Sequence, residues 1–242
     1  RAADEPAALA EALVAADSAQ LSMGGGSTER LREALAIYQS LGDLSSEGMV
    51  SGNIGCAAYL AGRWDEALDW FARDREIRQR AGSTVGAATA ASNIGEILVK
   101  RGELEEAEAL LREAVRAMRA TGYNDGAAYT ELQLARALLG RGALIDAVSL
   151  LDRISGEFAA FGQSASALEA AVVGALARTA QGNPSAALEL LDQAAARAGG
   201  ATAMLAPQVA EARGRALAAL GDTAAAAREI DGGIAAARRL GM

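Results

Sequence analysis

Residues 52–71 read GNIGCAAYLAGRWDEALDWF, and residues 92–111 read SNIGEILVKRGELEEAEALL. The two stretches begin 40 residues apart and share Asn-Ile-Gly at the same offset, followed by a glycine and a Glu-Ala pair. Self-similarity at a fixed period of this size is typical of repeat architectures, in which each unit packs on its neighbours. Glycines continue at nearly this spacing in two alternating series: Gly62, Gly102, Gly142, Gly182 and Gly221, and Gly42, Gly82, Gly122 and Gly162.

The sequence between these glycines has a helical pattern. Apolar residues of one segment recur at i, i+3, i+4 and i+7: Leu104, Ala107, Leu110, Leu111, Ala114 and Met118. A glycine after a helix adopts the left-handed conformation at little cost and so ends the helix. The chain is 4% aromatic and has three prolines, and its apolar residues are mostly Ala and Leu, which favour helices over strands. We therefore predict an all-α fold, with two helices in each repeat.

One position in each repeat stays small: Gly55, Gly95, Ala135, Ala175 and Gly214. A glycine inside a helix costs roughly 0.5–1 kcal/mol relative to alanine, so its recurrence needs a reason. Two helices approach closely only where their side chains are small. We predict a close crossing of the two helices of each repeat, with Gly55 facing Ala67 and Gly95 facing Ala107.

These features resemble the tetratricopeptide repeat. The matching residues are Asn53-Ile54-Gly55, Gly62, Ala67 and Phe71 in one unit, and Asn93-Ile94-Gly95, Gly102, Ala107 and Leu111 in the next. The period of 40 departs from the usual 34 of this family. HEAT repeats also have periods near 40. In this chain, however, the turn between the two helices has a glycine followed by an aromatic residue or leucine and then by an alanine, and this pattern is similar to the tetratricopeptide repeat. The segments GRWDEAL, SNIGEIL and GELEEAEALLREA resemble the C-terminal repeats of actinobacterial class III adenylate/guanylate cyclases that carry an ATPase domain.

The resemblance implies a right-handed α-solenoid of about six helix hairpins. It predicts a single superhelical domain over residues 1–242, with hairpins at roughly 4–42, 43–82, 83–122, 123–162, 163–200 and 201–241. The chain begins with Arg1 and both ends lack a polar capping helix, so we expect a fragment of a larger protein or ends that a dimer partner covers.

The composition excludes several classes of function. The net charge of −8 argues against nucleic acid or an anionic membrane surface as the main partner, and no apolar run is long enough for a membrane span. The chain has no histidine and one cysteine, Cys56, which excludes His-based triads, most zinc sites and an intrachain disulfide. The segment GGGST lacks the lysine of a phosphate-binding loop. We therefore predict no enzyme activity, no cofactor, no metal and a reducing, cytoplasmic setting, although a parent protein of cyclase type fits the resemblance.

The remaining candidate site is a surface, the concave face that the first helices of tetratricopeptide repeats line. In peptide-binding members, an asparagine at the place of Asn53 and Asn93 binds the backbone of an extended peptide, since an amide offers a donor and an acceptor. The lysines of the family's carboxylate clamp are missing, because Met49, Gly52 and Ser92 stand there, so recognition of an acidic terminus is not expected. The positions that the resemblance assigns to the groove are Met49, Gly52, Asn53, Cys56, Thr89, Ser92, Asn93, Glu96, Lys100, Tyr129, Gln133 and Arg136.

Two functions follow from these expectations. The first is an interaction scaffold that binds a peptide or protein segment on the concave face, in a bacterial signalling or transcription-regulatory protein. The second is an intramolecular regulatory arm of a nucleotidyl cyclase or ATPase-type regulator, or a homodimerisation module that uses the uncapped ends. In the second case the amides of Asn53 and Asn93 face water or support local packing.

Overall fold

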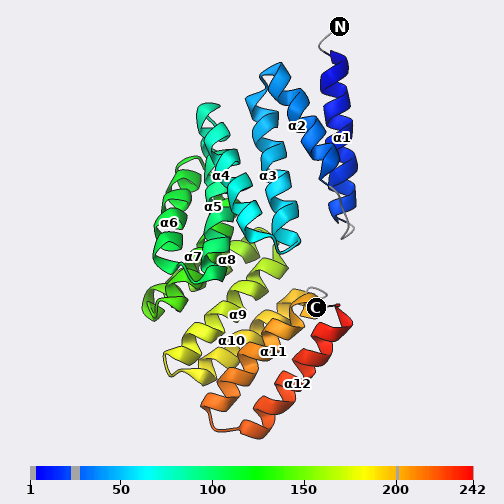
Figure 1. The fold of residues 1–242 in the computed structure, drawn as a ribbon. Helices are drawn as coiled ribbons and strands as arrows, with labels where there is room; N and C mark the ends of the chain where they lie inside the picture. Colours follow the sequence, from blue (N-terminus) through cyan, green and yellow to red (C-terminus); the bar gives the residue numbers. More distant parts are fainter. Residues whose placement is uncertain (1–3, 23–27, 200–201, 242) are drawn as a thin grey trace. The chain divides into compact units, whose positions relative to one another are not determined.

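The computed structural model describes residues 4–22, 28–199 and 202–241, and within these ranges it consists of twelve α-helices and contains no strand (Figure 1). Consecutive helices pack side by side from α1 to α5 and from α7 to α12, which confirms the predicted all-α solenoid of helix pairs. The helices are α1 Asp4–Ser22, α2 Glu29–Leu41, α3 Leu44–Leu60, α4 Trp64–Arg80, α5 Thr84–Arg101, α6 Leu104–Ala120, α7 Asn124–Gly140, α8 Leu144–Ala160, α9 Ser164–Ala180, α10 Pro184–Ala198, α11 Thr202–Ala219 and α12 Thr223–Arg239.

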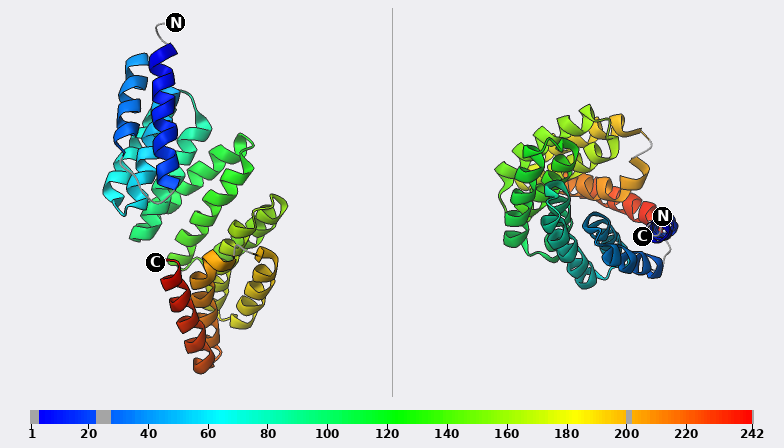
Figure 2. Two further views of the ribbon diagram at one scale, coloured as in Figure 1. Left: turned by 90° about the vertical axis from the view of Figure 1, so that its right-hand side faces the viewer. Right: turned by 90° about the horizontal axis from the view of Figure 1, so that it is seen from above.

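The chain forms two compact units, each of which is described by itself. Unit 1 comprises Arg1–Arg101 and Glu113–Tyr123, and unit 2 comprises Gly102–Arg112 and Asn124–Met242. Helix α6 therefore contributes its first half to unit 2 and its second half to unit 1. Figure 2 shows the antiparallel helices of each unit from two further sides.

The glycines of both sequence series end helices, as predicted. Gly62 has a φ of +73°, and its N–H donates to the carbonyl of Tyr59 at 3.0 Å, while the N–H of Arg63 reaches back to the carbonyl of Ala58 at 2.9 Å. These bonds satisfy carbonyls that the end of α3 leaves without an intrahelical partner. The same positive φ recurs at Gly42, Gly82, Gly102, Gly122, Gly142, Gly162, Gly182 and Gly221.

The core of each unit consists of side chains from neighbouring helices. In unit 1, Phe71 of α4 packs with Ala58 and Ala67 and reaches Ile97 of α5, the first helix of the next repeat. In unit 2, Phe158 of α8 packs in a cluster with residues of α7 and α9. Because each cluster is built from adjacent helices, a hairpin buries its apolar face only when the next one is in place.

The prediction that Gly55 faces Ala67 is wrong. A Cβ atom added to Gly55 would lie 2.7 Å from Cδ1 and Cε1 of Phe71, so the ring of Phe71 occupies the space that the missing side chain leaves. Side chains of a helix lean toward its N-terminus, which carries the ring of Phe71 back over the turn that holds Ala67. At the last hairpin a Cβ on Gly214 would lie 2.8 Å from Cδ1 of Ile230, the bulky residue, and also 3.4 Å from the carbonyl oxygen of Ala226, the residue equivalent to Ala67.

Candidate functional site

Helix α3 presents a stripe of accessible residues on the side away from its core. Met49 is 38% exposed, Asn53 is half-buried and Cys56 is exposed, and their spacing of three to four residues places them on one face of the helix. The opposite side of α3 holds Val50 and Ile54, which are buried against α1 and α2. This core contact fixes which face of α3 stays open.

Helix α5 repeats the stripe 40 residues later. Thr89 and Lys100 are exposed, and Asn93 and Glu96 are half-buried. Ser92, another predicted groove residue, is buried between the helices, so the accessible stripe of α5 consists of the other four side chains.

The two stripes are joined within unit 1. The hydroxyl of Tyr59 in α3 donates a hydrogen bond to Oε1 of Glu96 in α5. Nζ of Lys100 lies 3.8 Å from the same oxygen and 5.5 Å from the centre of the Tyr59 ring. This cluster ties α3 to α5 and sets their stripes side by side. We call the combined surface the α3–α5 face; it consists of Met49, Gly52, Asn53, Cys56, Thr89, Asn93, Glu96 and Lys100.

Asn53 and Asn93 occupy equivalent places on this face, one on each helix. Within the described ranges, neither side chain makes a hydrogen bond to another residue. Both amides therefore keep their donors and acceptors for water or for a bound molecule.

The third set of predicted residues belongs to unit 2. On α7, Tyr129 is 40% exposed, Arg136 is half-buried and Gln133 is 1% exposed. Arg136 donates to Oε1 of Gln133 at 3.0 Å and to Glu169 of α9 at 2.5 Å. Nε2 of Gln133 has no partner in the part of the chain that the structure describes. Arg136 and Gln133 of α7 thus form a polar cluster with Glu169 of α9 inside unit 2.

One feature of the α3–α5 face was missed by sequence reasoning. Asp74 of α4 lies three residues after Phe71 and three before Ile77, in the stripe that forms the core side of this helix, and it is 5% exposed. Nε of Arg78 donates to its Oδ1 at 2.8 Å. The sequence signal was a charged residue at a position where later repeats have Ala114, Ile154 and Ala194.

Asp74 and Cys56 are electrostatically coupled. Burial raises the pKa of Asp74 above its ordinary value, although Arg78 acts in the opposite direction. Loss of surrounding water raises the pKa of the Cys56 thiol, and the charges of Asp74 and Glu96 raise it further. Cys56 is therefore a neutral thiol at pH 7 and is not activated as a nucleophile.

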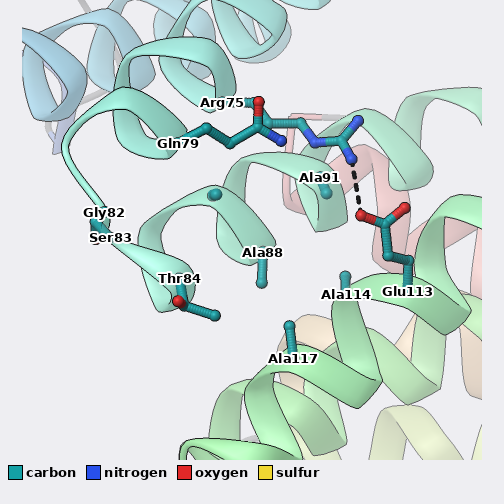
Figure 3. A pocket seen from close by; sticks show the side chains of 11 residues that line it. Arg75, Gln79, Gly82, Ser83, Thr84, Ala88, Ala91, Glu113, Ala114 and Ala117 are labelled. Atoms are coloured by element: carbon teal, nitrogen blue, oxygen red, sulfur yellow. Dashed lines mark hydrogen bonds and ion pairs between the residues drawn. The ribbon is translucent and has the colours of Figure 1, made fainter.

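A separate hollow of about 290 Å³ lies between α4, α5 and α6 of unit 1 (Figure 3). Its floor is made of alanines, Ala88, Ala91, Ala114 and Ala117, and an ion pair of 3.1 Å joins Arg75 to Glu113 beside it. A similar hollow of about 220 Å³ in unit 2 has Ala167, Ala171 and Ala194 in its lining, each 80 residues after a residue of the first. Recurrence at the same register indicates that the hollow results from packing alanine-rich helices, and none of the predicted groove residues lines it.

The described residues hold no group of His, Cys, Asp and Glu side chains that could bind a metal ion. Nor does any described helix combine the length and the hydropathy of a membrane span. The chemistry that the α3–α5 face offers is hydrogen bonding and charge.

Comparison with known protein families assigns the repeat. Models of the tetratricopeptide repeat match residues 52–81 and residues 86–155. These segments are tetratricopeptide repeats. They include the second half of α3, nearly all of α5 and the turns after both helices, so the residues of the α3–α5 face other than Met49 lie within the matched segments. A search of the curated proteins found no match to the chain.

Several solved structures have the same fold. The apo form of RapI aligns with a TM-score of 0.73 at 12% identity, over 98% of this chain and 84% of RapI. BtubC from P. vanneervenii aligns with a TM-score of 0.59 at 15% identity, over 81% of this chain and 89% of BtubC. The Rap conjugation gene regulator of plasmid pLS20, solved in complex with the Phr* peptide, aligns with a TM-score of 0.57 at 13% identity, over 88% of this chain and 70% of the regulator. At these identities the similarity concerns the fold alone.

Proposed function

We propose that the α3–α5 face binds an extended peptide or protein segment, and that the chain acts as a non-catalytic interaction scaffold. The observation that carries this proposal is the pair of amides on Asn53 and Asn93, which sit at the same place in adjacent repeats and have no hydrogen-bond partner among the described residues. An extended peptide presents N–H and C=O groups at regular intervals, and a primary amide can pair with both.

Two further observations support the proposal. The core contacts and the Tyr59–Glu96 hydrogen bond hold α3 and α5 in a fixed relation, so the amides need little reorganisation on binding. The plasmid pLS20 regulator, which has the same fold, was solved with a bound peptide. A bacterial signalling or transcription-regulatory role in a reducing, cytoplasmic compartment is part of the proposal, and it rests on the sequence resemblance and on the single cysteine.

The test is peptide capture by a double variant, Asn53→Ala with Asn93→Ala. The probe is an array of random-sequence heptapeptides with acetylated N-termini and amidated C-termini, exposed to fluorescently labelled protein. We expect the amount of labelled double variant bound to the array to be about tenfold or more below that of the wild type, since each amide would contribute about 1 kcal/mol through hydrogen bonds. We expect its melting temperature to fall by no more than a few degrees, because neither side chain supports a contact in the fold.

The control is Asn183→Ala, which removes an exposed amide at the start of α10 that makes no capping bond. This variant should retain the same peptides as the wild-type protein. Equal retention by the folded double variant would exclude the asparagines as peptide contacts, and a double variant that does not fold would show that they are structural.

A second candidate function is packing of the last hairpin against another part of a larger protein or against a second copy. The favouring observation is an apolar hollow of about 220 Å³ on α11 and α12, where Ile230 and Ile234 stay partly exposed. A cyclase-type or ATPase-type parent belongs to this candidate and rests on the sequence resemblance alone. Absence of any peptide retention by the wild-type protein would favour it over peptide binding.

A further inference from the structure

One oxygen of the Asp74 carboxylate accepts a hydrogen bond, and the other has no donor among the described residues. Oδ1 accepts the hydrogen bond from Nε of Arg78, whereas Oδ2 accepts none from the residues that the structure describes. The side chain is 7% exposed, so it is almost enclosed by α3 and α4. A nearly buried carboxylate oxygen without a donor is unfavourable, because it has lost hydration without a replacement.

Two glycines of α3 make room for this carboxylate. A Cβ atom added to Gly48 would lie 3.1 Å from Oδ1, and one added to Gly52 would lie 2.8 Å from Oδ2. Gly48 is buried, whereas Gly52 is half-buried and belongs to the α3–α5 face. The free oxygen of Asp74 therefore lies on the side where α3 carries no side chain and the surface is open.

The glycines and the carboxylate occur together in one repeat only. Forty residues later, Ala88 and Ser92 replace the two glycines and Ala114 replaces Asp74. The small position at Gly55, by contrast, recurs in every repeat because the helix crossing needs it. Two helical glycines each cost roughly 0.5–1 kcal/mol relative to alanine, and no crossing explains them here. Gly48 leaves room for the paired side chains of Asp74 and Arg78, and Gly52 opens Asp74 to the α3–α5 face.

Two carboxylates lie within electrostatic reach of this opening. The charges of Asp74 and Glu96 both act on Cys56, one turn after Gly52, and raise its pKa. The nearest cations are engaged with the acids, since Arg78 binds Oδ1 of Asp74 and Lys100 lies 3.8 Å from Glu96. A positively charged group placed over Gly52 and Cys56 would meet a carboxylate oxygen that still lacks a donor.

We propose that Asp74, reached through the opening at Gly52, binds a lysine or arginine side chain of a peptide that lies on the α3–α5 face. This inference rests on the proposed function and names the class of partner: a segment with a basic side chain. An N–H donor with a positive charge forms a stronger hydrogen bond to a carboxylate than a neutral donor does. A peptide held by Asn53 and Asn93 crosses the opening in mid-chain, which favours a side chain over the terminal ammonium group.

The experiment uses four proteins: wild type, Asp74→Asn, Gly52→Ala and Gly156→Ala. For each protein it measures which amino acids are enriched at each position of the array peptides that bind. The array is the blocked heptapeptide array described above. We expect lysine or arginine to be enriched at one peptide position with the wild-type protein, and this preference to fall about tenfold or more in Asp74→Asn. Gly52→Ala should have the same effect, because the new methyl group would lie 2.8 Å from Oδ2 and close the opening.

Gly156→Ala is the matched control, because a Cβ at this helical glycine of α8 would meet nothing within 4 Å. Its peptide preference should equal that of the wild type. If Asp74→Asn does not fold, Gly52→Ala decides the question alone, since its melting temperature reports whether the fold is intact.

Four outcomes would overturn the inference. The wild type could bind peptides without enrichment of lysine or arginine, or this enrichment could persist in the folded Asp74→Asn and Gly52→Ala proteins. Either result would keep the proposed peptide binding but show that Asp74 takes no part in it. The same heptapeptides with free N-termini form a second array. Retention on that second array alone, lost in Asp74→Asn, would show that this carboxylate binds the terminal ammonium group and not a side chain. No retention by the wild type would remove the proposed function and this inference together.

Discussion

Asp43 is the residue whose role in the fold is most directly testable. It precedes α3, and its Oδ1 accepts the backbone N–H of Ser46 at 3.1 Å while its Oδ2 accepts the Ser46 hydroxyl at 2.6 Å. The Ser46 hydroxyl bond and then the Ser46 backbone bond hold the pKa of Asp43 below its ordinary value. The charged carboxylate therefore stabilises the start of the helix that carries Met49 and Asn53.

We expect Asp43→Ala to reduce the free energy of unfolding by about 1 kcal/mol near pH 7. Because folding lowers this pKa, the contribution is present above the unfolded value of about 3.9 and is lost as the pH falls through the folded value. The difference between wild type and variant should shrink as the pH falls below the unfolded value of about 3.9. Asp43→Asn, which keeps a capping oxygen without a charge, should lose less stability than Asp43→Ala near pH 7, and its difference from the wild type should also shrink at low pH, because the wild-type carboxylate is then protonated. Thermal unfolding from pH 2.5 to 7 measures both, and a constant difference for Asp43→Ala would contradict the assignment.

At the scale of single residues, the sequence predicts helix caps and turns better than it predicts which side chains are buried. The cap at Asp43 and the chain-reversing glycines depend on residues a few positions apart, so the sequence shows them. Asp74 differs, because its environment is set by Gly48 and Gly52 of another helix, and sequence spacing alone does not reveal that a charged residue lies between two helices. The positions of Asn53 and Asn93 could be predicted, whereas the burial of Ser92 and Gln133 could not.

Between elements, the decisive contact is the crossing of α3 and α4. The sequence correctly predicts a small residue at Gly55, but not its neighbour, because periodicity gives the face of a helix and not the direction in which a large ring leans. Phe71 is 2% exposed and packs with Ala58, Ala67 and Ile97, so its ring has no free space to move into.

Gly55→Ala tests this crossing with one added methyl group. Its Cβ would lie 2.7 Å from two ring atoms of Phe71, so we expect a loss of about 1–3 kcal/mol in the free energy of unfolding, despite the better helix propensity of alanine. The same change at Gly156, where the new atom meets nothing within 4 Å, should raise stability slightly. Urea titrations of the two variants make the comparison, and equal midpoints would show that the helices do not cross closely at Gly55.

Over the whole molecule, stability arises from contacts between neighbouring helices. The cluster around Phe71 draws on α3, α4 and α5 of unit 1, and the cluster around Phe158 draws on α7, α8 and α9 of unit 2. In a repeat protein of this kind, the total stability is approximately a sum of unit and nearest-neighbour contributions. A cavity in one cluster should therefore loosen its own neighbourhood and leave distant helices protected, in contrast to a globular domain with one shared core.

Phe158→Ala and Phe71→Ala form a reciprocal pair that tests this locality. Each removes a large side chain that is at most 2% exposed, a change that typically costs about 3–5 kcal/mol. Amide hydrogen exchange followed by mass spectrometry should show faster exchange in α7–α9 for Phe158→Ala and in α3–α5 for Phe71→Ala, with little change in the other set of helices. Faster exchange across all helices in both variants would mean that the chain opens as a single cooperative body. Because the α3–α5 face depends on the Phe71 cluster, the locality result also predicts that Phe158→Ala keeps peptide retention on the array and that Phe71→Ala loses it.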